Sequence, residues 1–268
     1  MSVVAVANQK GGVGKTTTTV NLAAASAESG RRTLVIDADA QANATSALGA
    51  ESQGTFLYDA LLGQADLGRC VVSTAWPRLD AVPSSMDLVA AEIELASRER
   101  REYVLRSALQ EVAGRYDLVL IDCGPSLGLM TLNALSASDA VIAPVQCEYL
   151  ALEGLSALLE TIRRVQMQLN PGLHLLGVVA TMYDGRTRLS QDVATQLKAH
   201  ISSPFDTIIP RSIRLSEAPS HQQPILDYAP RSRGAEAYRE LTEELLNRLS
   251  DLPPSTLYRS GALDGVAR

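Results

Sequence analysis

A glycine-rich stretch, residues 8 to 17, carries the residue types that can hold a phosphate group: Asn-Gln-Lys-Gly-Gly-Val-Gly-Lys-Thr-Thr. It lies between an apolar run at residues 3 to 7 and a helix-like stretch at residues 17 to 27. A strand that turns through glycines into a helix opening Gly-Lys-Thr is the layout of a phosphate-binding loop. The alternative, a glycine-rich turn before an ordinary helix, does not require these features to coincide in this order.

Each residue type in this loop has a chemical reason to be there. Gly11, Gly12 and Gly14 leave room for successive backbone N–H groups to point into one concavity and meet phosphate oxygens. Lys15 adds a positive charge beside the β- and γ-phosphates, and Thr16 offers a hydroxyl to Mg²⁺. The free N–H groups and the positive dipole end of the following helix favour the same anion.

The loop departs from the common pattern G-x-x-x-x-G-K-[ST] at its first position, where this chain has Gln9 followed by Lys10. A second lysine therefore sits on the phosphate loop. Its charge is either simply solvated or, with nucleotide bound, meets phosphate of its own site or of a facing one.

Acidic residues close two other apolar runs. Residues 32 to 36 lead into Asp37-Ala38-Asp39, and residues 116 to 121 lead into Asp122. Asp37 and Asp39 stand at the end of one strand and are expected to do different jobs, with a helix N-cap as the alternative for either. A hydrophobic run ending in Asp is how a second Mg²⁺-associated carboxylate is delivered beside a phosphate loop.

The order of the apolar and amphipathic segments predicts an α/β fold. Strands and helices alternate along the chain, which favours a mostly parallel, twisted sheet with helices on both faces, the architecture of a P-loop NTPase. Ligands then bind at the carboxyl ends of the strands, where Lys15, Asp39 and Asp122 all fall. The elements expected after residue 36 lie at 57–62, 79–82, 87–95, 97–112, 116–122, 139–145, 150–169, 173–182, 189–201, 207–209 and 234–249.

Length and composition bound the class of protein. The 268 residues, 46% hydrophobic and 20% charged, suit one globular domain over residues 1–249, and the Pro-, Ser- and Gly-rich residues 250–268 are expected to form a disordered tail. No apolar run reaches the roughly 18 residues of a membrane span. Because Met1-Ser2 leads directly into the first strand, we expect no signal peptide and a cytoplasmic location. The net charge of −6 argues against a globally basic nucleic-acid binder but not against a local basic patch.

Further motifs accompany the phosphate loop: DADAQANAT at 37–45, IDCGPSLG at 121–128, PVQCEY at 144–149, LEG at 152–154, IPRSIRLSEAPSH at 209–221 and PRSRGA at 230–235. In this order they resemble the ParA/Soj-type partition ATPases, the deviant Walker A branch of the P-loop NTPases. The resemblance covers roughly residues 1 to 249. Gly124 stands where relatives commonly have Pro, which is expected to loosen the second switch loop.

The resemblance implies a Mg²⁺-dependent ATP hydrolase, slow on its own, that forms a nucleotide-sandwich dimer in which Lys10 reaches the partner's ATP. Lys10, Lys15 and Asp39 would be catalytic, with Asp39 positioning the attacking water. Asp122 would act on Mg²⁺ through water as the Walker B acid, and Asp37 would support the metal beside Thr16. The implied nucleotide contacts are Lys10, Gly11, Gly12, Val13, Gly14, Lys15, Thr16 and Thr17, with Met182, Pro210 and Arg211 at the adenine.

The family also binds double-stranded DNA without sequence preference when it is dimeric and ATP-bound, and the centromere-binding protein ParB stimulates it, which implies association with the nucleoid. Residues 184–233 hold seven Lys/Arg against five Asp/Glu, so this region is mildly basic. Aromatic residues are scarce, at 4%, which suits arginine contacts to duplex phosphates better than base stacking. The matching positions are Arg186 and Arg214, with Arg188, Arg231 and Arg233 as neighbours.

Three other functions stay open on the residues alone. A MinD-like membrane-associated ATPase needs a C-terminal amphipathic helix, which the prolines at 253 and 254 and the composition of 258–268 disfavour. An iron–sulfur ATPase of the nitrogenase iron-protein kind needs two cluster cysteines per subunit. Cys123 and Cys147 do not match that pattern, and with Cys70 they are interpreted as small buried apolar residues. A metabolic synthetase that uses ATP to activate a small molecule is the third.

Overall fold

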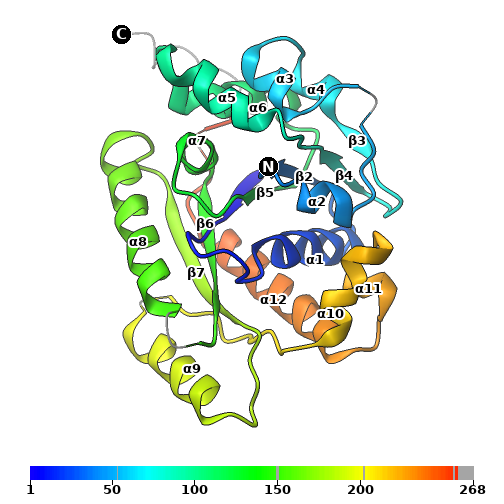
Figure 1. Ribbon diagram of the computed structural model, residues 1–268, viewed down its shortest axis with the longest axis vertical. Helices are drawn as coiled ribbons and strands as arrows, with labels where there is room; N and C mark the ends of the chain where they lie inside the picture. The colour runs from blue at the N-terminus through cyan, green and yellow to red at the C-terminus, as the bar shows by residue number, and fades with distance from the viewer. Residues whose placement is uncertain (53, 149–150, 202, 256, 259–268) are drawn as a thin grey trace.

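The computed structural model describes residues 1–268 apart from 53, 149–150, 202, 256 and 259–268, so Tyr149 of the predicted motif lies outside the described residues (Figure 1). The strands are β1 (Ser2–Val6), β2 (Thr33–Ala38), β3 (Val72–Ser73), β4 (Leu79–Val82), β5 (Leu118–Cys123), β6 (Ala140–Gln146) and β7 (His174–Thr181). They form a seven-stranded sheet in the order β3-β4-β2-β5-β1-β6-β7. Neighbouring strands pair in parallel except β3 and β4, which confirms the predicted mostly parallel α/β sheet.

Helices fill the connections between the strands. The α-helices are α1 (Lys15–Glu28), α2 (Asn43–Ala47), α3 (Leu57–Leu62), α4 (Leu67–Cys70), α5 (Leu88–Glu94), α6 (Val104–Leu109), α7 (Leu129–Ser136), α8 (Ala151–Gln168), α9 (Arg188–His200), α10 (Ile213–Glu217), α11 (Ile225–Tyr228) and α12 (Arg233–Ser250). Short 3₁₀ helices lie at Leu95–Ser97, Arg101–Tyr103, Gln110–Val112 and Ala218–His221.

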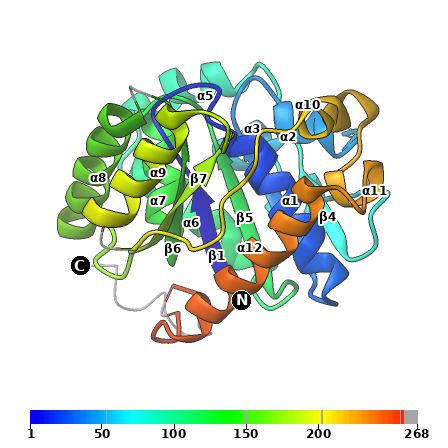
Figure 2. The same ribbon diagram turned by 90° about the horizontal axis from the view of Figure 1, so that it is seen from below.

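The helices cover both faces of the sheet and bury a hydrophobic cluster on each (Figures 1 and 2). Helices α3 to α9 pack on one face, and α1, α2 and α10 to α12 pack on the other. Strand β5 shows why a continuous apolar run is needed: Val119 and Ile121 enter the first cluster, while Leu118 and Leu120 enter the second. A central strand with a polar face would not fit between these layers.

The prediction of one continuous helix over residues 97–112 is wrong. Arg98 has an extended backbone and Arg100 a positive φ of 57°, so the chain breaks between the 3₁₀ helix that ends at Ser97 and α6. Asn133 of α7 then accepts a hydrogen bond from the Leu105 N–H at 3.1 Å, near the start of α6. This contact is tertiary, and helical periodicity in the sequence does not report it.

The strand predicted at 207–209 is also wrong. Pro204 and Pro210 carry no N–H and cannot donate to a ladder, and the structure has only isolated pairings of these residues with Val178 and Tyr183. The Thr207 N–H donates instead to Glu244 of α12, at 3.1 Å.

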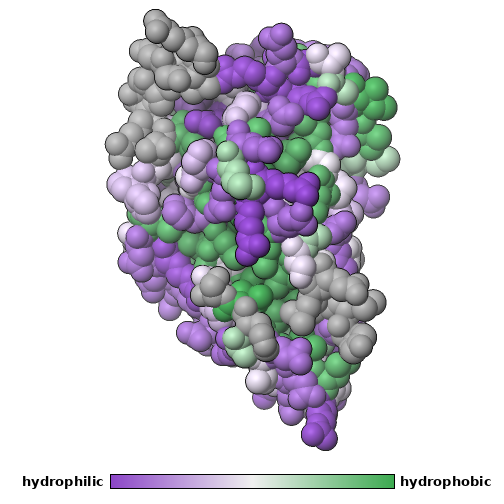
Figure 3. Space-filling view, turned by 90° about the vertical axis from the view of Figure 1, so that its left-hand side faces the viewer, coloured by the Kyte–Doolittle hydropathy of each residue, from purple (hydrophilic) through white to green (hydrophobic). Residues whose placement is uncertain are grey.

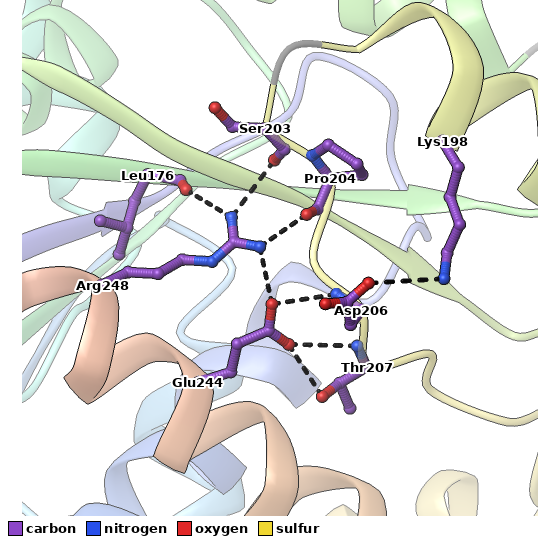
Figure 4. A network of polar contacts seen from close by, with 8 residues as sticks. All are labelled: Leu176, Lys198, Ser203, Pro204, Asp206, Thr207, Glu244 and Arg248. Carbon is purple, nitrogen blue, oxygen red and sulfur yellow. Dashed lines mark hydrogen bonds and ion pairs between the residues drawn. The ribbon is translucent and has the colours of Figure 1, made fainter.

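A polar network around Arg248 and Glu244 holds this segment against α12 (Figure 4). Glu244 accepts hydrogen bonds from the Asp206 and Thr207 N–H groups, and the Arg248 guanidinium donates to Glu244 at 2.6 Å and to the Pro204 carbonyl at 2.6 Å. Arg248 also lies over the Phe205 ring, 4.1 Å from its centroid. The network therefore fixes the chain that leads from α9 to residues 209–211.

Described residues of the C-terminal segment contact the body of the protein, and the disordered tail expected over 250–268 stays a prediction. The Tyr258 hydroxyl donates to the Ala137 carbonyl, and the Gln110 amide donates to the Leu257 carbonyl at 2.7 Å. Leu257 is buried. An apolar side chain and two carbonyl contacts bind this stretch to the body of the protein, and residues 256 and 259–268 of the predicted tail lie outside the described residues.

The side of the molecule that carries α8 and α9 mixes hydrophilic with apolar side chains (Figure 3). Among the residues that the structure describes, no helix combines the length and the apolar character that crossing a membrane requires.

Candidate functional site

The glycine-rich loop joins the buried end of β1 to α1. Gly12 and Gly14 have positive φ angles of 74° and 89°, a backbone region that glycine adopts without a steric penalty. Asn8 fixes the start of the loop, because its side chain accepts from the Lys10 N–H at 3.0 Å and donates to the Pro144 carbonyl at 2.7 Å. Gly14 then precedes α1, whose first N–H groups are free for an anion.

Lys15 lies under this loop. Its side chain is buried, and its ammonium group donates to the Lys10 carbonyl at 3.1 Å. Burial lowers the pKa of Lys15 from its usual value, and the nearby carboxylates of Asp122 and Asp39 oppose that shift. The ammonium therefore stands beside the loop, and the nearby carboxylates favour its charged form, which is the form that binds phosphate.

The strand register brings two carboxylates together. Asp37 on β2 is paired with Asp122 on β5, and both are buried. Asp122 accepts hydrogen bonds from the Thr16 hydroxyl at 2.7 Å and from the Thr19 hydroxyl at 2.9 Å. Burial, followed by the charge of Asp37, raises the pKa of Asp122. A divalent cation at Thr16 would reverse this effect by favouring the carboxylate form.

Asp37 has partners of its own. It accepts from the Thr45 N–H at 2.8 Å, from the Thr45 hydroxyl at 2.7 Å and from the Asp39 N–H at 3.2 Å. Burial raises its pKa, against the effect of these hydrogen bonds. The hydroxyl of Thr16 and the two carboxylates are hard oxygen groups, which suit Mg²⁺ bound partly through water. Within the described residues, no group of three or more His, Cys, Asp or Glu forms a metal cluster.

Asp39 follows β2, which ends at Ala38, so strand alternation does not decide where its side chain points. It is half-buried and accepts from the Gln41 N–H at 3.0 Å. A Cβ at Gly124 would lie 3.5 Å from the Asp39 carboxylate carbon, so the two loops are in close contact. The expected loosening of this loop by Gly124 stays a prediction.

A cavity of about 300 Å³ opens next to the loop, lined by Gly14, Thr17, Met182, Pro210 and Arg211 among others. Met182 has a positive φ of 53°, a conformation that costs energy for a residue with a side chain. The three residues expected at the adenine therefore come together beside the phosphate loop.

The five arginines expected to contact DNA are all exposed and lie on loops and helix starts: Arg186 in the loop after β7, Arg188 at the start of α9, Arg214 in α10, Arg231 before α12 and Arg233 at its start. Two contacts bring these elements near one another. Tyr183 pairs with Pro210, and a Cβ on Gly234 would lie 3.0 Å from the side chain of Leu215.

Two of these arginines already pair with acids of the same chain. Arg186 donates from Nε and Nη2 to Asp184 at 2.9 and 2.7 Å, and this lowers the pKa of Asp184. Arg214 lies 3.0 Å from Glu217. Both guanidinium groups remain largely exposed, so a phosphate can approach them only in competition with these acids.

Sequence reasoning missed several threonines that complete the site. Thr19 and Thr45 donate to the two buried carboxylates, and the Thr181 hydroxyl donates to the Val13 carbonyl of the loop at 2.8 Å. Thr19 lies one turn after Lys15 in α1, a spacing that the sequence does contain. The positions of Thr45 and Thr181 depend on how separate elements meet, which no local pattern reports.

Comparison with known proteins assigns the family. A family model described as an AAA domain matches residues 1–175. The chain is 51% identical to the sporulation initiation inhibitor protein Soj of Bacillus subtilis, over 91% of this chain and 97% of that protein. It is 48% identical to the chromosome partitioning protein ParA of Caulobacter vibrioides, over 94% and 96% of the two chains. The chain belongs to the ParA/Soj family of chromosome-partitioning ATPases.

Solved structures agree with this fold. A structure from Mycobacterium smegmatis with bound ADP and magnesium, named cobyrinic acid a,c-diamide synthase, has a TM-score of 0.83 and 39% identity over 96% of this chain and 99% of that one. The cell division ATPase MinD of Pyrococcus furiosus has a TM-score of 0.75 and 25% identity over 92% and 98%. The ADP and magnesium bound in the first of these structures agree with the nucleotide and Mg²⁺ expected as cofactors of this ParA/Soj-type ATPase.

The three cysteines of this ParA/Soj-type chain lie in its interior. Cys70, Cys123 and Cys147 are buried and unpaired as disulfides, as interpreted from the sequence. Burial raises the pKa of the Cys147 thiol to about 11, which favours the neutral thiol expected of a buried apolar residue.

Proposed function

We propose that this chain drives DNA segregation as a sandwich dimer that forms with ATP, binds double-stranded DNA without sequence preference, and is released when a ParB-type partner stimulates ATP hydrolysis. The observation that carries the proposal is the convergence of Lys15, Thr16, Asp37 and Asp122 under one glycine loop. These groups occupy the carboxyl ends of adjacent strands, where an α/β sheet binds its ligand.

The position of each residue determines the role that we propose for it. Lys15 and the loop N–H groups bind the phosphates, while Thr16 and Asp122, with Asp37 behind them, hold Mg²⁺ directly or through water. Mg²⁺ neutralises phosphate charge when bound. Asp39 is half-exposed and is the carboxylate best placed to orient an attacking water. Lys10 is half-buried beside Gly154 of α8, and in the proposed dimer its side chain reaches the nucleotide of the second copy.

DNA binding rests on the exposed arginines. A dimer presents each of them twice, so nucleotide-dependent dimerisation doubles the number of phosphate contacts and makes binding depend on the nucleotide. The ATP-bound protein is therefore proposed to associate with the nucleoid.

A gel shift with duplexes of unrelated sequence tests this proposal, with ATP, ADP or no nucleotide, at two salt concentrations. We expect binding only with ATP, weaker at higher salt, and retained by Asp39→Ala because that variant binds ATP but hydrolyses it slowly. Arg214→Glu should weaken binding about equally for all duplexes. Arg164→Glu is the matched control, since Arg164 is similarly exposed but lies on α8, with side-chain exposures of 68% and 61% for Arg164 and Arg214. Equal binding with all three nucleotide states contradicts the proposal.

A metabolic synthetase is the second candidate, because a solved neighbour with 39% identity is named as one. The two functions differ in what accelerates hydrolysis. Duplex DNA with a ParB-type protein should raise the ATPase rate of a partition protein, whereas a cobyrinic acid substrate should raise that of a synthetase.

A further inference from the structure

Helix α5 presents apolar side chains to solvent. Met86, in the turn two residues before α5, is 67% exposed. Val89 and Ile93 lie four residues apart on one side of the helix and are 54% and 74% exposed. Leu88 and Ala91 on the opposite side are buried in the core. A stripe of this kind on the outer side of an amphipathic helix is typical of a contact surface.

A small cavity of about 150 Å³ adjoins this stripe. Leu88, Val89 and Met130 give it apolar walls, and Asp39 and Glu92 contribute two carboxylates; its other lining residues are Ala38, Ala40, Gly124, Pro125, Ser126 and Thr131. No Lys, Arg or His is among these lining residues. The cavity therefore has the chemistry to accept the aliphatic stem of a lysine or arginine and to pair with its charged end.

Glu92 connects the helix to the second loop. It accepts a hydrogen bond from the Met130 N–H at 3.2 Å, near the start of α7, and a Cβ on Gly128 would lie 2.9 Å from its carboxylate oxygen. A ligand that moves α5 or neutralises Glu92 must therefore also affect the loop that contacts Asp39.

We propose that this stripe and cavity, the α5 surface, dock a short amphipathic segment of a partner protein, with apolar side chains on Met86, Val89 and Ile93 and a lysine or arginine between Asp39 and Glu92. The inference rests on the proposed function, in which a partner controls hydrolysis. It adds the location and the chemistry of that contact.

Charge favours such a partner over an anionic membrane. Residues 85–95 hold three acids, Asp87, Glu92 and Glu94, and no base. Anionic lipid headgroups would be repelled, whereas a basic peptide is attracted over roughly 8–10 Å at physiological salt. The partner's cation also pairs with the Asp39 and Glu92 carboxylates, whose charges apolar contacts alone would bury without a counter-charge.

The test uses the full chain with purified ParB-type protein from the same organism. Ile93→Ser is compared with Met167→Ser, a matched control because Met167 lies on α8 with 73% exposure against 74% for Ile93. Both variants should keep the basal ATPase rate, since neither side chain is in the nucleotide site. We expect the partner concentration for half-maximal stimulation to rise at least tenfold for Ile93→Ser, from the loss of several buried CH₂ groups, and to change less than twofold for Met167→Ser.

Glu92→Gln tests the cation. Glutamine keeps an acceptor for the Met130 N–H but removes the charge, so stimulation should weaken and should depend less on salt than in the parent. If the partner stimulates the parent and Ile93→Ser equally, docking on the α5 surface is refuted while the proposed function stands. No stimulation of the parent contradicts the proposed function, and the docking with it. Impaired ATP-dependent dimerisation of Ile93→Ser without partner, measured by light scattering, would instead make this surface a contact between copies and overturn the partner assignment.

Discussion

Replacing Glu217 by Gln should strengthen ATP-dependent DNA binding. Glu217 holds Arg214 at 3.0 Å and accepts the Tyr228 hydroxyl at 3.0 Å through the same oxygen. Glutamine retains that acceptor but loses its charge. Arg214 then meets a DNA phosphate without competition from a carboxylate charge of its own chain.

The size of the effect follows from exposure. The Arg214 and Glu217 side chains are 61% and 40% exposed, so water screens the pair and its loss changes an equilibrium by only about 1.4- to 5-fold. A dimer carries two such pairs, and independent sites multiply, which gives about 2- to 25-fold tighter binding. The salt slope adds a second readout. It stays constant if Arg214 already exchanges Glu217 for phosphate, and rises by about two units per dimer if Glu217 had kept Arg214 off the DNA.

Fluorescence anisotropy of a labelled duplex, titrated with ATP-bound protein at several salt concentrations, measures both quantities. Glu28→Gln is the matched control. It removes the same charge from an ion pair, since Glu28 accepts from Arg239 at 2.7 and 3.0 Å, but Arg239 is not among the arginines assigned to DNA. Unchanged or weaker binding by Glu217→Gln, or an equal gain in Glu28→Gln, would refute the competition argument.

Three further outcomes are expected. Lys15→Ala should abolish ATP binding by removing the buried ammonium at the loop, and normal affinity in a nucleotide titration would contradict the loop assignment. Gly12→Val should bind ATP yet fail to dimerise in light scattering. A Cβ at position 12 would have nothing within 4 Å in one chain, whereas in the sandwich dimer it would collide with the partner. Gly63→Val, at the same φ of 74°, controls for backbone strain. Burial would raise the pKa of Glu244, but hydrogen bonds from the 206–207 N–H groups outweigh it and lower the pKa. The Glu244 carboxylate therefore stabilises the fold above its unfolded pKa of about 4.5, and this stabilisation is lost as pH falls through the folded pKa. The difference in unfolding free energy between the parent and Glu244→Gln, measured by urea unfolding, should shrink below about pH 4.5.

The residues of the phosphate loop could be predicted because their chemistry is local. Gly12, Gly14, Lys15 and Thr16 follow one another in the chain, and the loop conformation needs glycine at the two positive φ angles that the structure has. Asp122 could be predicted for a related reason, since an apolar strand ending in an acid delivers its side chain to the ligand edge of the sheet.

Elements that depend on tertiary contacts could not be predicted in this way. The segment at 207–209 has the composition of a strand. Its Ile209 N–H does bond to the Ala180 carbonyl of β7 at 2.8 Å, but the Thr207 N–H bonds to Glu244, which lies 37 residues later. Leu257 and Tyr258 lie in a segment whose composition is typical of disorder, and they contact an apolar site and the Ala137 carbonyl. In each case a partner distant in sequence decides the outcome, and composition carries no information about it.

Distant contacts also link the metal side of the site to the α5 surface. Asp37 accepts from the Thr45 hydroxyl, which in turn accepts from the Ser84 N–H at 2.9 Å, four residues before α5 begins. On the other side, Glu92 of α5 bonds to the Met130 N–H beyond the loop that touches Asp39. The segment that leads into α5 therefore bonds to one of the two loops at Ser84, and α5 itself bonds beyond the other at Glu92. A partner bound at α5 can bias both loops, because a displacement of α5 acts on the Glu92 bond directly and on the Ser84 bond through the few residues between them.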